Sequence, residues 1–253
     1  MNPVIQTIMN RKSMRVYERR PIPPDVRDQI LQAAMRAPTA GNMMLYSILE
    51  VQDQAKKERL VQTCDNQPFI AEAPLVLIFL ADYQRWFDYF QYSGVQEHLL
   101  KPGQELVRPQ EGDLLLACCD ALIAAQTAVL AAESLGLGSC YIGDILENYE
   151  IHRDMFELPP YALPVAMLCI GYPTEEERNR QQTSRYDAEF IRFQDRYKRL
   201  SGTDFERMFG PDASGPDSAG VRLYRRKFSA AFSIEMRRSV RAMFDGLRDS
   251  RVG

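Results

Sequence analysis

Apolar residues recur along much of this chain at the three- and four-residue spacing of one helix face. The spacing predicts helices over about 3–10, 24–37, 53–64, 113–135 and 228–247. Pro38 ends the second of these helices, and Gly136 follows the fourth at the position where glycine commonly closes a helix. A further helix is expected after Gly143, where Asp144 and Glu147 have the spacing of a capping box.

Three shorter stretches are apolar without helical spacing, and they predict strands over 46–51, 73–80 and 164–171. The last two are continuous apolar runs, which is typical of strands covered on both faces. A short extended piece is expected at Val16–Tyr17. Helices that alternate with apolar strands indicate an α+β or α/β sandwich with helices on both faces of the sheet.

Two segments carry further expectations. The helix over 113–135 is apolar nearly all round, which predicts burial on most of its faces. Polar residues interrupt its most apolar part, so the pattern favours a buried helix over a membrane span. The segment 82–112 contains the only tryptophan, Trp86, and five further aromatic residues up to Tyr92. These rings either pack internally or cover a binding site, and the pattern alone favours neither.

The composition narrows the function classes. The chain has 253 residues, of which 45% are hydrophobic, and its net charge of -3 offers no electrostatic case for a nucleic-acid or membrane-surface partner. The first residues lack the pattern of a secretory signal. Five cysteines without a CxxC pair predict reduced thiols in the cytoplasm. The histidines, His98 and His152, lie far from these cysteines along the chain, which argues against a metal site.

No motif for catalysis by side chains alone is present, because the sequence contains no GxSxG, no HExxH and no P-loop. No GxGxxG follows a predicted strand, so a Rossmann dinucleotide site is not supported. An enzyme built on this chain would therefore rely on a cofactor. Arg11, Lys12, Ser13 and Arg15 follow the first helix and suit a phosphate, although cations at a helix C-terminus also complement its dipole.

Two more pieces suit a ligand site. Residues 37–42 place a proline, a hydroxyl, a glycine and an amide between a helix and a strand, which is either an ordinary loop or a polar binding turn. The glycines of 136–143 would let the backbone approach a flat ring, and nearby N–H groups could reach ring oxygens.

Together these pieces resemble the nitroreductase superfamily. The matching segments run in order from residue 4 to about 200: Arg11-x-Ser13-x-Arg15, Ala37-Pro38-Thr39-x-Gly41-Asn42, Asn66–Ile70, Glu133–Gly143 and Leu158–Pro173. Each motif is weak alone, but five in the right order are specific. The chain is most similar to the branch of larger oxygen-insensitive nitroreductases and NADPH–flavin reductases.

The resemblance implies an α+β fold, an α-β-α sandwich with a central, mainly antiparallel sheet. It implies FMN bound without a covalent link, in a homodimer whose subunits both line each site. Residues 1–200 would form the FMN-binding domain, and residues 201–253 an extension that wraps the partner subunit rather than an independent domain.

The resemblance also assigns site residues in this sequence. Arg11, Lys12, Ser13 and Arg15 would hold the phosphate and ribityl chain of FMN. Thr39 and Gln67 would face the ring system, and Asn42 belongs to the same turn as Thr39. Tyr141, Ile142, Gly143 and Asp144 would pass beside the isoalloxazine. A later Lys-x-Arg pair of the larger branch aligns with Thr183 and Arg185, which leaves Arg180 or Arg178 to supply the missing cation.

The implied reaction is a ping-pong transfer from NADPH or NADH through FMN to a nitroaromatic, a quinone or free flavin. The choice of nicotinamide is open, because Arg222, Arg225 and Arg226 either bind a 2′-phosphate or form a solvated surface. Within the superfamily, the alternatives are reductive dehalogenation and fragmentation of reduced flavin. From a different class, the chain could be a flavin-binding redox sensor or partner with little turnover.

Overall fold

The structure is a computed structural model, and it describes residues 1–249. Its contacts divide the chain into two compact units, one formed by residues 1–180 with the chain from 236 onward, the other by residues 181–235. This boundary lies earlier in the chain than the predicted division at residue 200. The last residues of the predicted extension, 250–253, lie outside the described residues.

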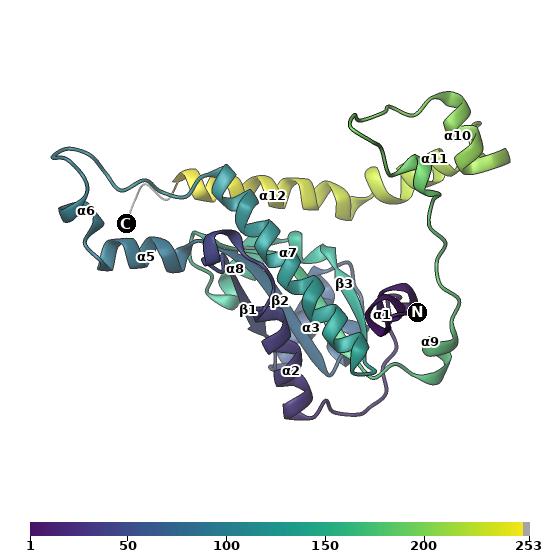
Figure 1. Ribbon diagram of the computed structural model, residues 1–253, viewed down its shortest axis with the longest axis horizontal. Helices are drawn as coiled ribbons and strands as arrows, with labels where there is room; N and C mark the ends of the chain where they lie inside the picture. The colour runs from purple at the N-terminus through teal and green to yellow at the C-terminus, as the bar shows by residue number, and fades with distance from the viewer. Residues whose placement is uncertain (250–253) are drawn as a thin grey trace. The chain divides into compact units, whose positions relative to one another are not determined.

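A four-stranded antiparallel sheet forms the centre of the larger unit (Figure 1). Its strands are β1 (Tyr46–Glu50), β2 (Leu75–Asp82), β3 (Gly138–Ile142) and β4 (Ala162–Gly171), in the order β1-β2-β4-β3. Every residue of β2 is buried, as the continuous apolar run predicted. The expected antiparallel sheet is therefore confirmed, and β3 adds an edge strand that the apolar pattern did not indicate.

Helices cover both faces of this sheet. On one face, α2 (Pro24–Met35) and α7 (Glu111–Ser134) pack on Leu77, Phe79 and Leu168. On the other face, α3 (Gln54–Thr63), α4 (Phe69–Glu72) and α8 (Tyr149–Phe156) enclose a second apolar cluster around Ile78 and Met167. The remaining helices of this unit are α1 (Pro3–Asn10), α5 (Gln84–Tyr92), α6 (Val95–His98), α9 (Glu175–Asn179) and most of α12 (Ala231–Asp249). The predicted sandwich is confirmed.

Helix α7 packs through small side chains, since Ala121, Ala124, Ala125 and Ala128 are fully buried against the sheet and α2. Its length and composition would also suffice for a membrane span, but it occupies the position of a core helix. The prediction that it is buried on most faces is wrong for a single chain. Large apolar residues remain exposed on it, with Leu115 at 68%, Leu122 at 45% and Ile123 at 40%.

The predicted capping box at Asp144 and Glu147 is also wrong. A short 3-10 turn spans Gly143–Leu146, and α8 begins only at Tyr149, with Asn148 as its N-cap. The carboxylate of Asp144 instead accepts a hydrogen bond from Gln67, at 2.7 Å. A contact with a residue far away in the sequence therefore takes the place of the local cap.

The smaller unit contains α10 (Gly202–Phe209), α11 (Ala219–Leu223), a π-helical turn (Tyr224–Phe228) and the first residues of α12. Ser201 and Asp204 form a capping box at the start of α10. Arg207 pairs with Glu189 and lies over the ring of Phe190. All of these contacts join residues of the smaller unit to one another.

Candidate flavin site

The predicted phosphate-binding segment lies along the free edge of β3. Helix α1 ends at Asn10, and the backbone then turns to run beside the strand. Met14 N–H donates to the carbonyl of Ser139 at 2.9 Å, and Ser13 forms a parallel bridge with Ser139. Arg11, Lys12, Ser13 and Arg15 are thereby held beside the strand that leads to Gly143.

Two glycines of β3 and its following turn have different roles. A Cβ at Gly138 would come within 2.4 Å of Met14 Cγ and 2.9 Å of Met14 Cβ, so glycine is needed there to seat Met14 in the core. A Cβ at Gly143 would meet no atom within 4 Å. The expectation that these glycines admit a flat ring therefore does not hold for Gly138, whereas Gly143 borders open space.

A fourth cation, Arg180, joins the segment from a part of the chain far away in the sequence. Arg180 donates a hydrogen bond to the carbonyl of Ser13 and pairs with Glu177 at 2.9 Å. The ammonium group of Lys12 donates in return to the carbonyl of Arg180, and to that of Arg178 at 2.6 Å. Lys12 thus links the two segments through hydrogen bonds. The sequence had predicted a contact with the phosphate for Lys12, and not this link.

Arg178, the other candidate for the missing cation, turns away from Ser13. Its Nε donates to the carbonyl of Pro173 at 3.0 Å, and its guanidinium lies 3.7 Å from the carboxylate of Glu18. Of the two arginines, Arg180 is the one that lies at the predicted phosphate segment.

Glu133, at the end of α7, lies beside the same cations. Burial raises the pKa of its carboxyl to about 6, against the opposing effects of the Ser139 hydroxyl and of Arg11 and Lys12. Ser139 Oγ donates to Glu133 at 3.3 Å. Glu133 was not predicted as a site residue, because the cations beside it are brought there only by the fold.

On the opposite face of β3, Gln67 and Asp144 form a polar pair. Gln67 Nε2 donates to Asp144 at 2.7 Å and to the carbonyl of Cys64 at 3.0 Å. The guanidinium of Arg15 lies 6.0 Å from the centre of the Phe69 ring on this face. Gln67, Asp144 and Arg15, predicted separately, therefore lie around the same strand.

The side chains of Tyr141 and Ile142 are directed toward protein. Ile142 is buried in the core, and Tyr141 Oη donates to Gln126 of α7 at 3.4 Å. Burial raises the pKa of Tyr141 to about 12, so its hydroxyl is a neutral donor. These two residues can therefore offer mainly their backbone to a ligand.

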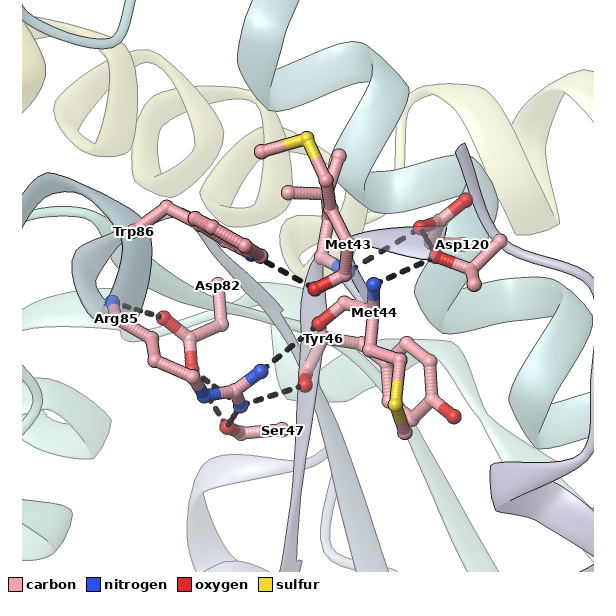
Figure 2. A network of polar contacts seen from close by, with 10 residues as sticks. Met43, Met44, Tyr46, Ser47, Asp82, Arg85, Trp86 and Asp120 are labelled. Atoms are coloured by element: carbon pink, nitrogen blue, oxygen red, sulfur yellow. Dashed lines mark hydrogen bonds and ion pairs between the residues drawn. The ribbon is translucent and has the colours of Figure 1, made fainter. Parts of the chain in front are cut away.

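Thr39 and Asn42 belong to a separate part of the fold, the loop of residues 39–45 (the 39–45 loop). Thr39 Oγ1 donates to the buried carboxylate of Asp120 on α7 and accepts from Met44 N–H at 2.8 Å (Figure 2). Its hydroxyl is thus engaged within the protein, while Gly41 and Asn42 are exposed. Asp120 was not predicted as a site residue, because in the sequence it is only a polar residue within an apolar helix.

The aromatic segment meets the same loop from the other side. Trp86 Nε1 donates to the carbonyl of Met43 at 2.7 Å, and Arg85 donates to the carbonyls of Met44 and Tyr46, each at 3.0 Å (Figure 2). The first turn of α5 therefore packs on the protein, whereas Tyr89 and Tyr92 are exposed. The segment contains both internal packing and exposed rings.

Arg185 lies in the smaller unit, where its guanidinium donates to the carbonyls of Thr183 and Ser184 at 3.0 and 3.2 Å. Its part in the site stays a prediction. In the same unit, Arg222 pairs with Asp212 at 2.9 Å, and Arg225 and Arg226 lie in the π-helical turn.

Other reactive groups belong to the scaffold. His152 is fully buried between the carbonyl of Ile145 and the hydroxyl of Thr63, and burial lowers its pKa to about 4. Burial also raises the pKa of the Cys64, Cys140 and Cys169 thiols. No group of three or more potential metal ligands occurs among residues 1–249. A cavity of about 400 Å³ beside Arg20 and Lys57 has none of the predicted site residues in its lining.

Known proteins resemble this chain in both sequence and fold. The Nitroreductase family model matches residues 8–172, which include the β3 edge, the 39–45 loop and the Gln67 turn. The chain belongs to the Nitroreductase family. It is 34% identical over 175 residues to a Bacillus subtilis protein named FMN reductase, NAD(P)H, covering 69% of this chain and 68% of that one. It is also 31% identical over 201 residues to an oxygen-insensitive NADPH nitroreductase of Salmonella typhimurium, covering 79% and 77%.

Solved structures extend the likeness over nearly the whole chain. An oxidoreductase from Bacteroides fragilis matches with a TM-score of 0.80 and 28% identity, covering 96% of this chain and 97% of that one. The NADPH:FMN oxidoreductase from Vibrio harveyi, solved with NAD+, also has a TM-score of 0.80, at 23% identity, and covers 96% and 98%. At this low sequence identity, the similarity to the Vibrio harveyi enzyme shows a shared fold only.

Proposed function

We propose that this member of the Nitroreductase family is an FMN-dependent NAD(P)H oxidoreductase that reduces small nitroaromatic, quinone or flavin acceptors. The observation that carries the proposal is the position of Arg180 at Ser13, which completes a cluster of cations along the edge of β3. The names of the relatives, an FMN reductase and an NADPH nitroreductase, support the same cofactor and donor.

The residues present fit FMN in two respects. Arg11, Arg15 and Arg180 supply forked donors for a phosphate, and such donors bind phosphate oxygens in pairs. Gly143, at the other end of β3, leaves space that a side chain would fill. Cations beside β3 and an open backbone position just past its end at Gly143 suit a long ligand with a phosphate at one end and a flat ring at the other.

The chain's own residues would bind and orient the cofactor. Arg11, Ser13, Arg15 and Arg180 would hold the phosphate, and Lys12 would keep Arg180 in place through its backbone contacts. Gln67, fixed by Asp144, would offer its amide to the ring edge. The chemistry that FMN supplies when bound is acceptance of hydride from the nicotinamide and transfer of electrons to the acceptor.

We further propose that the active form is a homodimer with shared sites. Helices α1 and α7 lie side by side and expose apolar residues, with Val4 and Met9 each at 62% and Leu115 at 68%. Exposed apolar surface of this kind marks an interaction site. A second copy on this surface would cover α7 and could bring its 39–45 loop to the β3 edge of the first chain. Thr39 and Asn42 would then join the other site residues across the interface.

Initial-rate kinetics test the proposed activity. NADPH and NADH oxidation would be measured on FMN-loaded protein at several fixed concentrations of p-benzoquinone and, separately, of a nitroaromatic. A ping-pong enzyme gives parallel double-reciprocal lines, and the faster donor identifies the preferred nicotinamide. Intersecting lines would contradict the ping-pong order. Oxidation no faster than in protein-free FMN would overturn the proposal and favour a sensor or redox partner.

The proposed location is the cytoplasm, consistent with the five free cysteines. Fractionation of cells that produce the full chain would test it, with the activity expected in the soluble fraction. Activity recovered outside that fraction would contradict it.

A further inference from the structure

The 39–45 loop has an unusual backbone that needs external support. Gly41, Asn42 and Met44 all have positive φ, at 55°, 58° and 49°. Glycine adopts this region freely, but asparagine and especially methionine occupy it at a cost in free energy. Three left-handed residues within a run of four are stable only where contacts with the rest of the protein hold the backbone in that conformation.

Asp120 supplies that support from α7. It is 3% exposed, and its carboxylate accepts from the Thr39 hydroxyl, from Ala40 N–H at 3.0 Å and from Leu45 N–H at 3.2 Å. The three donors lie at the two ends of the loop, so one side chain fixes both ends. Among the described residues, no arginine or lysine pairs with this carboxylate, and its bonds go to the loop.

Helix α5 holds the opposite side of the loop. Trp86 donates to the carbonyl of Met43, and Arg85 donates to the carbonyl of Met44. Arg85 also donates to Ser47 Oγ at 2.8 Å and to Asp82 at 3.2 Å. Asp82 accepts in addition from the Ser47 hydroxyl at 2.5 Å. The amides of Ala40 and Leu45 therefore bind Asp120, and the carbonyls of Met43 and Met44 bind α5. Gly41 and Asn42, between these contacts, are exposed.

We infer that Asp120 is a positioning residue of the flavin site: it holds the 39–45 loop in the left-handed conformation that presents Gly41 and Asn42 to the bound cofactor. This inference rests on the proposed function. Asp120 itself is buried and acts only through the loop. An isosteric amide cannot replace it, because an amide oxygen near Thr39 and Leu45 would place an NH2 group against Ala40 N–H.

The test compares Asp120→Asn with Asp113→Asn on the full-length protein. Asp113 lies on the same helix and caps its first turn by accepting from Gln110 N–H at 2.9 Å, a hydrogen bond that stays within that turn. Both variants should lower the unfolding temperature. Only Asp120→Asn should raise the Kd for FMN, by about tenfold or more. Hydrogen exchange of the Ala40 and Leu45 amides in the FMN-free protein should also become faster only in Asp120→Asn.

The outcomes separate the two proposals. Wild-type protein that fails to bind FMN would overturn the proposed function itself. Wild-type binding together with unchanged Kd and exchange in folded Asp120→Asn would overturn the inference alone. Equal weakening in both variants would show a merely structural effect and would also overturn it. If Asp120→Asn does not fold, Thr39→Val and Thr39→Ser replace it. Weaker binding together with faster Ala40 and Leu45 exchange in Thr39→Val, both reversed in Thr39→Ser, supports the inference. Equal exchange in the two variants contradicts it, because loss of a direct contact between Thr39 and the cofactor would weaken binding alone.

Discussion

The guanidinium of Arg180 donates a hydrogen bond to the main-chain carbonyl of Ser13, which lies 167 residues earlier in the chain. Lys12 closes the contact from the other side by donating to the carbonyl of Arg180. Two segments that are distant in the sequence are therefore held as one cationic edge beside β3. We propose that Arg180 supplies the cation that the family resemblance leads one to expect at Thr183.

Replacing Arg180 by glutamine should weaken FMN binding. One charge-assisted contact with phosphate contributes about 1.5–3 kcal/mol, so we expect the Kd to rise roughly 10- to 100-fold in a fluorescence titration. Arg178→Gln is the matched control, because it removes the same charge two residues away, where the side chain binds Pro173 and lies near Glu18. Similar small increases in both variants would contradict the assignment of Arg180.

Alanine substitutions at Gly138 and Gly143 should separate an effect on the stability of the fold from an effect on FMN binding. Gly138→Ala forces its Cβ against Met14 and should lower the free energy of unfolding by about 1–3 kcal/mol. Gly143→Ala meets no atom and should leave stability within about 0.5 kcal/mol, yet it should raise the Kd for FMN. Urea unfolding and FMN titration of both variants measure the two effects. Unchanged FMN affinity in Gly143→Ala would show that the cofactor does not pass this residue.

His152 should make the fold less stable in mild acid. Its pKa is lowered from 6.5 to about 4 by burial, so the folded state keeps it neutral while the unfolded chain takes up a proton. The stabilising contribution is complete above pH 6.5 and is lost as the pH falls toward 4, by about 3 kcal/mol in total. Urea unfolding at pH 7 and pH 4.5 should show a smaller loss in His152→Asn than in wild type. Equal losses would contradict a buried, neutral His152.

Shared sites predict complementation between two defective subunits. Arg15→Gln damages the β3 edge and Asp120→Asn damages the 39–45 loop. In a mixed dimer with shared sites, one site carries both defects and the other carries none. Subunit exchange between the two variants should therefore restore activity, at up to about half of the wild-type activity in each mixed dimer. Activity that stays at the level of the unmixed variants would indicate sites built within one subunit.

The elements with strong local patterns were predictable from sequence. Helix α1 spans 3–10 as expected, α7 spans 111–134 against an expected 113–135, and β2 spans 75–82 against an expected 73–80. β3 was missed because Gly138–Ile142 is short and is defined by its pairing with β4. The prediction of a capping box was wrong because the Asp144 carboxylate accepts a hydrogen bond from Gln67, a contact that no local motif reveals.

The candidate site could be predicted from sequence only as a set of segments. Motif order pointed to Arg11–Arg15, Thr39–Asn42 and Gly143, because each is short and local. Which segments meet depends on contacts across the fold, such as that of Thr39 with Asp120, 81 residues away. For the same reason, Arg178 and Arg180 were equivalent in the sequence and differ in the structure.

The central claim, that the chain carries FMN reducible by a nicotinamide, is tested most directly by the visible absorbance of the purified protein. The full-length protein would be loaded with FMN, freed of unbound flavin and mixed without oxygen with NADPH or NADH. The account predicts flavin bands that remain with the protein and bleach on addition of at least one donor. Protein that retains no FMN, or retains FMN that neither donor bleaches, would contradict it.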